Sequence, residues 1–348
     1  MRFRTFLSWL LVFFSIPLAL LAKCPIGTNG TLEIRAPAGN LFVDTSGTDS
    51  VDVELSDRQA MLQESCGQDT VSVTATVPTV IGIPDWKIRV PKGVLLDLST
   101  QGGNIKVDDT DGRETRLRTS GGKVTTGNIK GNALIYATEV HAGNIGGNAE
   151  LRGLGGRLQV GNVGGNVLFS TTGGDIATGV VKGDVRVETG SGSVLIRESI
   201  GDATVTTQEG DIVSDYIHGS FDGRTDSGNI RIENVGGWFQ AVTNVGDIFF
   251  RLVPEKLTGD LHVNVEAALG NITMYIPEKM KAAIDAVVDK PAYNAKRIFS
   301  DFPLKAPVNA FRNIPGGPEK GGTVINGGGN TIRVHTSVGT ISIFSIKD

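Results

Sequence analysis

Between Gly156 and Gly246 the sequence repeats itself every 18 residues. One copy is Thr-Thr-Gly-Gly-Asp-Ile (171–176), and later copies keep its first threonine, its second glycine and its final aliphatic residue. A strict short period is the signature of a solenoid, in which each coil packs only on its neighbours. We expect one turn of every coil to depend on the recurring glycines, which are Gly174, Gly192, Gly210, Gly228 and Gly246.

Each repeat has room for two short strands. In the repeat 183–200, Val185 and Val187 alternate with polar residues, and Val194 and Ile196 do the same after the next turn. Alternation with a period of two indicates half-buried strands. The sequence therefore predicts an all-β protein, a parallel β-solenoid (β-helix) with about 18 residues per coil. The general preference of parallel crossover connections favours a right-handed coil.

The periodicity also predicts how the chain is divided. The repeats occupy 97–276, and the flanking segments 23–96 and 277–348 are expected to be an N-terminal β cap and a C-terminal cap with closing strands. Caps are needed because an open coil exposes unpaired strand edges. Within the second cap, Lys279–Asp289 fits either a short helix or a strand, and its position favours a strand.

The N-terminus has the composition of an export signal. Arg2 and Arg4 form a basic start, Phe6–Leu21 is an almost unbroken apolar stretch, and Ala22 offers a small residue for cleavage. We therefore predict a signal peptide over 1–22 and an exported protein. An uncleaved membrane anchor is the alternative, and the sequence does not distinguish periplasm, cell surface and extracellular medium.

The chain contains two cysteines, Cys24 and Cys66. In an oxidising compartment an even pair suggests one disulfide, and two unpaired thiols are the alternative. Lys23 argues against a lipoprotein, because a small residue must precede a lipidated cysteine. With no nearby histidine cluster the pair does not predict a metal site, and no cofactor is expected.

Composition argues against several classes of partner. The formal net charge of −4 is mild and evenly spread, so it gives no electrostatic case for nucleic-acid binding. Aromatic residues make up only 6% of the chain, which argues against a stacking platform for bases or sugars.

Solenoids also include polysaccharide lyases and hydrolases, so paired carboxylates matter here. Candidates are Asp175, Asp211 and Asp247, which each follow a turn glycine. The same position holds Ser193 and Asn229 in the intervening repeats, and a tight turn selects this mixture of residue types. The carboxylates therefore predict turn chemistry, and no catalytic residue is assigned.

Two further sets of polar residues have structural interpretations. The repeated threonines are expected to satisfy turn amides or neighbouring coils, and they are Thr189, Thr207, Thr225 and Thr243. The histidines are far apart in the sequence and form no metal-ligand or hydrolase motif, and they are His141, His218, His262 and His335.

Three segments carry a resemblance to a known family. They are Trp86–Val107, the repeated Thr-x-x-Gly-Asp-Ile, and the closing segment Ile325–Ile343. Together they resemble the bacterial putative-adhesin family of exported or membrane-attached β-solenoid proteins of unknown function. The resemblance covers about residues 30–346 and implies a β-solenoid at the cell envelope without established catalytic activity. It supplies no functional residues.

These observations lead to an expected function. We expect an exported, non-catalytic cell-envelope protein whose adhesin-like solenoid presents a rigid surface to a protein or a glycan. The alternative is a polysaccharide-active β-helix lyase or hydrolase, and a purely structural scaffold is a third interpretation. The sequence leaves peripheral membrane contact and the oligomeric state open.

Overall fold

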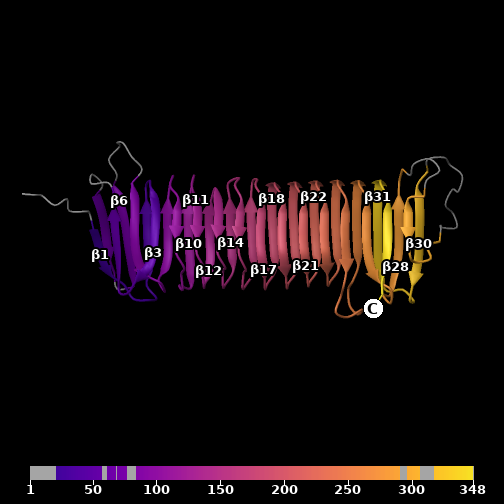
Figure 1. Cartoon of the computed structure of the whole chain (residues 1–348), viewed down its shortest axis with the longest axis horizontal. Coiled ribbons are helices and arrows are strands. Elements are labelled where there is room, and N and C mark those ends of the chain that lie inside the picture. The colour runs from indigo at the N-terminus through magenta and orange to yellow at the C-terminus, as the bar shows by residue number, and fades with distance from the viewer. Residues whose placement is uncertain are drawn as a thin grey trace, which may run out of the picture.

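A computed structural model describes residues 21–56, 61–67, 69–76, 84–290, 296–305 and 317–347. Its regular structure is entirely β, in two long sheets of sixteen strands each that run side by side along an elongated rod (Figure 1). The prediction of an all-β, solenoid-like protein with parallel strands is therefore confirmed. None of the described segments forms an apolar helix of membrane-spanning length.

The two sheets have the following strands in order along the rod. Sheet A consists of β1 (Leu21–Pro25), β4 (Ser50–Leu55), β7 (Asp85–Pro91), β3 (Asn40–Gly47), β9 (Ile105–Val107), β11 (Lys123–Thr126), β13 (Glu139–Ala142), β15 (Leu158–Val160), β17 (Ile176–Val181), β19 (Val194–Ser199), β21 (Ile212–Ile217), β23 (Ile230–Val235), β25 (Ile248–Leu252), β27 (Ile272–Pro277), β32 (Ile341–Ile346) and β29 (Ile298–Ser300). Sheet B consists of β5 (Met61–Cys66), β6 (Thr70–Thr76), β2 (Thr31–Ala36), β8 (Leu95–Thr100), β10 (Glu114–Thr119), β12 (Asn132–Ala137), β14 (Ala149–Gly153), β16 (Val167–Thr171), β18 (Val185–Ser191), β20 (Ala203–Glu209), β22 (Phe221–Ser227), β24 (Phe239–Val245), β26 (Val263–Leu269), β31 (Asn330–Val338), β28 (Ala282–Val288) and β30 (Glu319–Ile325).

In the middle of the rod the chain alternates between the sheets. It passes along β18 in sheet B, turns into β19 in sheet A, and returns to sheet B as β20. Val185 pairs in parallel with Val167 in the preceding coil and with Ala203 in the next one. Equivalent residues of successive coils therefore lie beside each other, as the periodicity of the sequence predicts.

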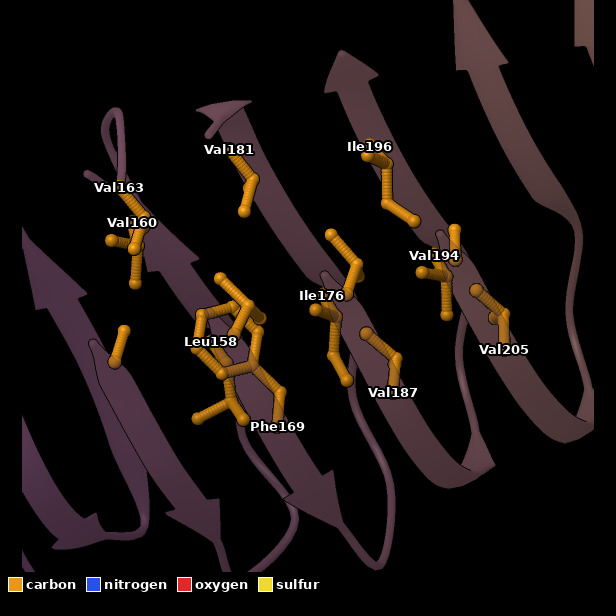
Figure 2. Close-up of a cluster of buried hydrophobic side chains, with 14 of the residues drawn as sticks. Leu158, Val160, Val163, Phe169, Ile176, Val181, Val187, Val194, Ile196 and Val205 are labelled. Carbon is orange, nitrogen blue, oxygen red and sulfur yellow. The ribbon is translucent and has the colours of Figure 1, made fainter. Parts of the chain in front are cut away.

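The core lies between the two sheets. Val185 and Val187 point inward and are buried, whereas Arg186 and Glu188 between and after them are exposed. Figure 2 shows the resulting aliphatic stack, in which side chains of both sheets meet along the rod. Burial of these stacked side chains on neighbouring coils supplies the main driving force for the fold.

One irregularity of the core has a packing reason. The inward column that holds Val205 continues with Gly223 in the next coil. A Cβ atom on Gly223 would lie 2.4 Å from the ring of Phe221, so the missing side chain makes room for that ring. Phe221 stacks on Phe239 with ring centroids 5.3 Å apart, and both rings are fully buried.

The turn glycines are required by both backbone conformation and space. Gly192 has a φ of 116°, in the left-handed region that favours glycine. A Cβ atom on it would lie 2.4 Å from the carbonyl oxygen of Gly174 in the preceding coil. Gly210, Gly228 and Gly246 repeat both features, so no larger side chain fits this column of turns.

At both ends of the rod the coils are stacked out of sequence order. Near the N-terminal end β2 lies between β8 and β6, and antiparallel strands β4, β1 and β5 cover the last coil. At the other end β31 is inserted between β26 and β28, and β32 between β27 and β29 (Figure 1). The last strands of the chain therefore complete a coil inside the rod.

Two local features agree with expectations from the sequence. The strand favoured within Lys279–Asp289 is confirmed as β28, which pairs with β31 and, antiparallel, with β30. The second feature concerns residues 122–156, where the sequence spaces Gly122, Gly143 and Gly156 by 21 and 13 residues and so indicates coils of irregular length. In the structure the backbone N–H of Asn144 donates to the side chain of Asn128, only 16 residues earlier, so a shorter coil lies here.

Candidate functional site

The carboxylates that follow the turn glycines form a hydrogen-bonded column along the rod. Asp175 Oδ1 accepts the backbone N–H of Ser193 at 3.0 Å, and Asp211 Oδ1 accepts that of Asn229 at 2.7 Å. The Ser193 hydroxyl and the Asn229 amide oxygen accept the N–H groups of Asp211 and Asp247 in the same way. We call this column, 175 to 247 in steps of one coil, the turn ladder.

The turn ladder explains the residue types without catalysis. Each side chain supplies an acceptor to a backbone N–H of the next coil at a turn, where the sheet does not provide one. Aspartate, asparagine and serine can all accept this bond, which accounts for their alternation along the sequence. Asp175 also pairs with Arg157 at 3.3 Å.

The turn ladder predicts a difference between two substitutions of one residue. Asp211→Ala should lower the free energy of unfolding by about 0.5–1.5 kcal/mol, because it removes the acceptor of the exposed Asn229 N–H. Asp211→Asn keeps an amide oxygen at that place and should change stability by less than about 0.5 kcal/mol. Urea unfolding of both variants tests this, and equal losses would contradict a role as hydrogen-bond acceptor.

The repeated threonines line the inside of the same turns. Thr207, Thr225 and Thr243 are buried, and their hydroxyls donate to the carbonyl oxygens of the turn glycines one coil earlier at 2.9–3.3 Å. Thr189 donates instead to the carbonyl of Ser191 at 2.9 Å. These hydroxyls are used within the turns and do not form an exposed ligand-binding face.

Three of the four histidines pair with a carboxylate of their own surroundings. Nε2 of His218 lies 2.8 Å from Glu198, and Nε2 of His335 lies 2.9 Å from Asp289. His262 contacts Asp260 at 2.8 Å, and the hydrogen bond from His262 lowers the pKa of the Asp260 carboxyl. The fourth, His141, is exposed on sheet A.

Two tryptophans lie in the described part of the chain, and they are far apart along the rod. Trp86 is fully buried near the N-terminal end, where its ring N–H donates to Ala38 O at 3.2 Å. Trp238 stacks on the ring of His262, with centroids 5.2 Å apart. The two indole rings therefore do not form a shared platform for a sugar.

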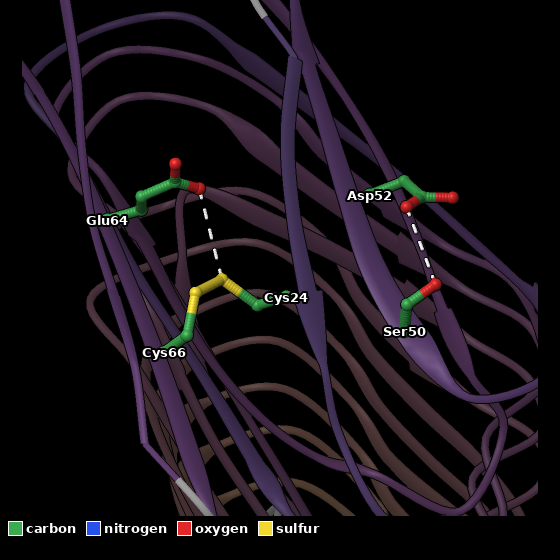
Figure 3. The surroundings of a disulfide bond; sticks show 5 residues. All are labelled: Cys24, Ser50, Asp52, Glu64 and Cys66. Atoms are coloured by element: carbon green, nitrogen blue, oxygen red, sulfur yellow. Dashed lines mark hydrogen bonds between the residues drawn. A yellow bond between two sulfur atoms is a disulfide. The ribbon is translucent and has the colours of Figure 1, made fainter.

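The two cysteines form a disulfide at the N-terminal end of the rod (Figure 3). Cys24 is buried in β1 at the edge of sheet A, and Cys66 lies in β5 at the edge of sheet B. The bond therefore joins the outermost strands of the two sheets. Glu64 Oε2 lies 3.8 Å from Cys24 Sγ, but both sulfurs belong to the disulfide, so this group has no thiolate to offer a metal.

A charged cleft of about 430 Å³ lies on the outer side of the first coils of sheet A. Its lining includes Asp44, Glu54, Arg89 and Lys106. Asp44 accepts hydrogen bonds from Ser46 and pairs with Arg89 at 3.2 Å, and these contacts lower the pKa of its carboxyl. A general acid for glycoside cleavage needs a raised pKa, so Asp44 is shifted in the opposite direction.

The most distinctive surface feature lies near the other end of sheet A. Four neighbouring strands, β25, β27, β32 and β29, each present one aromatic ring on the outer face, and these rings belong to Phe249, Tyr275, Phe344 and Phe299. The ring centroids of Phe249 and Tyr275 are 5.9 Å apart, and those of Tyr275 and Phe344 are 5.0 Å apart. We call these four residues the aromatic strip.

Basic side chains lie over the aromatic strip. The guanidinium of Arg251 is 4.9 Å from the centroid of Tyr275, and that of Arg231 is 4.4 Å from the centroid of Phe249. Arg231 also pairs with Glu233. Contacts of this kind are cation–π interactions, in which the guanidinium is attracted to the negative face of the ring.

The sequence alone did not reveal the aromatic strip. Its rings come from strands far apart in the chain, and β32 and β29 enter the sheet out of sequence order. The low aromatic content of the chain argued against a stacking platform, but four outward-facing rings come together on neighbouring strands of sheet A. The one available signal was a ring at an outward position of an alternating strand, as in Ile272–Pro277.

The family can be decided by comparison with known proteins. The sequence model of the family described as Toastrack DUF4097 matches residues 29–219 and, in a second overlapping match, residues 157–289. The chain belongs to the Toastrack DUF4097 family. This confirms the resemblance to an adhesin-like family that the sequence indicated.

The Toastrack chain also matches a solved structure, at low sequence identity and a low TM-score. A crystal structure of a putative cell adhesion protein from Clostridium sporogenes matches over 95% of this chain and 100% of its own, with 8% sequence identity and a TM-score of 0.21. No curated protein matches the chain.

Proposed function

We propose that this protein is an exported, non-catalytic component of the cell envelope that presents a rigid face to a protein or a glycan. The proposal places it in the periplasm, on the cell surface or in the extracellular medium. It includes a right-handed coil of 18 residues through the regular part of the rod, as the sequence predicts.

The aromatic strip is the observation that carries this proposal. Phe299 is 43% exposed, and Phe249, Tyr275 and Phe344 are half-buried on the same flat face. Neighbouring exposed rings with a polar rim mark contact sites on soluble proteins. The paired strands beneath them hold the rings in fixed positions, which lowers the entropy lost on binding.

Two further observations support the export part of the proposal. The first is the basic and apolar N-terminal sequence, which is typical of a signal peptide. The second is the disulfide between Cys24 and Cys66, because such bonds persist in oxidising compartments and are rare in the cytosol.

The non-catalytic part is supported by how the candidate carboxylates are used. Those of the turn ladder accept backbone hydrogen bonds, and Asp44 has a lowered pKa beside the charged cleft. The polysaccharide-active alternative would require a carboxylic acid held protonated near neutral pH opposite a second carboxylate.

Cell fractionation followed by binding to isolated envelopes tests the proposal. The full-length gene product should leave the cytoplasm with its N-terminus removed near Ala22, and the purified protein should bind envelopes. The double substitution Tyr275→Ala and Phe344→Ala should abolish envelope binding, whereas Phe42→Ala, which removes an exposed ring elsewhere on sheet A, should not.

Two results would contradict the proposal. One is a cytoplasmic protein with an intact N-terminus. The other is turnover of a polysaccharide that a single aspartate substitution abolishes, which would favour the lyase or hydrolase alternative.

A further inference from the structure

We propose that a groove along the rod, separate from the aromatic strip, binds a linear glycan of N-acetylated sugars. The groove lies on the side where the chain returns from sheet A to sheet B, and its volume is about 600 Å³. Three properties carry the inference: the direction of the groove, the hydrogen-bonding groups left free along it, and its balanced charge. We call it the asparagine groove.

The asparagine groove follows the rod axis because one short segment recurs in successive coils. Its sequence is Gly-Asn, an aliphatic residue, Lys or Gly, and Gly-Asn, at 127–132, 143–148 and 161–166. Parallel bridges join Ile129 to Ile145 and Ile145 to Val163, so the segments are stacked in register. The lining extends from Lys130 to Lys182, three coils further on, which is roughly 14 Å at the usual strand spacing. A linear polymer along the groove would therefore meet equivalent groups in successive coils.

Asparagine side chains supply free hydrogen-bond donors in the groove. Asn128, Asn144 and Asn162 line it and are exposed. The Oδ1 atom of Asn144 accepts the backbone N–H of Asn162 at 2.8 Å, and that of Asn162 accepts the N–H of Val180 at 2.9 Å. The Nδ2 group of Asn128 lies 3.4 Å from Asp109. Those of Asn144 and Asn162 have no partner among the described residues, so two neighbouring coils each present an amide donor.

Backbone carbonyl groups supply acceptors beside these donors. The carbonyl oxygens of Lys130 and Gly146 accept no hydrogen bond from the described part of the chain. A Cβ atom on Gly164 would lie 2.1 Å from the oxygen of Gly146, and one on Gly146 would lie 2.2 Å from that of Lys130. Because both residues are glycines, no side chain of theirs covers these oxygens. A donor and an acceptor therefore recur together along the groove.

This recurring pair of groups is complementary to an acetamido group. The carbonyl oxygen of an acetamido group accepts a hydrogen bond and its N–H donates one, so it can bind an asparagine Nδ2 and a backbone carbonyl together. A hydroxyl group is shorter and has one oxygen for both bonds. We therefore expect N-acetylated sugars to bind more tightly than sugars that carry a hydroxyl group at the same carbon.

The charge of the groove favours a neutral ligand. Lys130 and Lys182 have no carboxylate within ion-pair distance among the residues that the structure describes. Two carboxylates line the N-terminal end, where Asp111 pairs with Lys92 at 3.8 Å and Asp109 accepts a backbone N–H at 2.7 Å. Three lysines therefore face two aspartates, and neither a polyanion nor a polycation gains a clear advantage. The free ammonium groups can donate to the oxygens of a sugar.

An extended peptide fits the groove less well. Recognition of an extended peptide depends on pockets for its alternate side chains. The aliphatic residues Ile129, Ile145 and Val163 of the groove segments are buried in the core, and the exposed side chains around them are those of asparagine and lysine. The groove therefore offers few apolar side chains for a peptide to contact, whereas the hydrogen bonds described above suffice to position a glycan.

Titration of the full chain, with its disulfide intact, with two oligosaccharides of equal length tests the inference. One is the hexamer of β-1,4-linked N-acetylglucosamine. The other is the hexamer of β-1,4-linked glucose, which has a hydroxyl group in place of each acetamido group. Isothermal titration calorimetry should show that the N-acetylated hexamer binds at least about tenfold more tightly. Its affinity should change little with salt concentration, because the ligand is neutral.

Two asparagines of one coil provide a matched pair of variants. Asn144 lines the groove and Asn148 does not, yet the side-chain oxygen of each accepts a backbone N–H of the next coil at 2.8 Å. Asn144→Asp keeps that acceptor and removes the Nδ2 donor, so it should weaken binding of the N-acetylated hexamer by about tenfold. Asn148→Asp adds the same charge to the same coil and should leave binding unchanged. Both variants should unfold at the urea midpoint of the unmodified protein, because both keep the bond between coils.

Several results would overturn the inference. These are no binding of the N-acetylated hexamer at millimolar concentration, equal affinity for the two hexamers, or equal losses in Asn144→Asp and Asn148→Asp. Protection of the groove segments from hydrogen exchange by envelope protein, but not by the hexamer, would assign the groove to a polypeptide instead.

A further variant separates this inference from the contact proposed for the aromatic strip. The double substitution Tyr275→Ala and Phe344→Ala should leave binding of the N-acetylated hexamer unchanged. Loss of that binding would place the glycan on the aromatic strip and overturn the asparagine groove as its site. Failure of the aromatic strip to bind envelopes would leave the inference standing, because the hexamer is titrated in the absence of envelopes.

Discussion

Val194→Asp is expected to destabilise the rod by about 3–5 kcal/mol. Val194 is fully buried and pairs in register with Ile176 in the preceding coil and Ile212 in the next one. A carboxylate at this position would lie within the aliphatic stack of Figure 2, away from water and without a cation to pair with. The coils on either side share this stack, so the loss should spread to them.

The next residue provides a matched control for this prediction. Leu195 points to the outer face of the same strand and is 48% exposed. Leu195→Asp should therefore change the free energy of unfolding by less than about 0.5 kcal/mol. Urea denaturation followed by circular dichroism compares the two variants. Similar midpoints for Val194→Asp and the unmodified protein would mean that the inward and outward positions have been exchanged.

The stacking of coils in the middle of the rod could be predicted because two independent signals agree there. Alternation of apolar and polar residues sets which side chains of β18 and β19 face inward. The regular spacing of the turn glycines sets the number of residues between equivalent strands, and therefore their register. Both signals are local and recur in every repeat. The residue types of the turn ladder could also be predicted, since any tight turn selects them. The backbone N–H group that donates to each of these side chains became known only from the structure.

The arrangement at the ends could not be predicted in the same way. β31 fits between β26 and β28 because all three strands carry alternating aliphatic residues, and such a strand can pair with many others. Nothing local to Asn330–Val338 specifies which coil it joins. The aromatic strip depends on this insertion, because β32 brings Phe344 beside Tyr275.

The terminal coils of a stacked protein unfold more easily than its middle coils. A middle coil is held on both sides, whereas a terminal coil is held on one side and exposes strand edges. At the C-terminal end, insertion of β31 and β32 ties the last coil to the rod. At the N-terminal end the disulfide between β1 and β5 provides a covalent tie.

Removal of this disulfide is the second prediction with a large expected effect. Cys24 and Cys66 are 42 residues apart in the sequence, and in the chain-entropy account closing such a loop stabilises the folded state by about 4 kcal/mol. Cys66→Ser should lower stability by about that amount, with the loss concentrated in β1, β4 and β5. Hydrogen–deuterium exchange should show faster exchange in these strands than in β18 to β24.

Reduction of the unmodified protein provides the control for packing effects of the substitution. Dithiothreitol should reproduce the faster exchange of the N-terminal strands, and the double variant Cys24→Ser and Cys66→Ser should not respond to it. If reduction left the exchange of β1 and β5 unchanged, hydrogen bonding to β4 and β6 would suffice to hold these edge strands. If reduction instead speeds exchange in β1 and β5 as expected, the N-terminal end of the rod stays closed only while the disulfide is oxidised. Export to the envelope would provide the oxidising compartment that this requires.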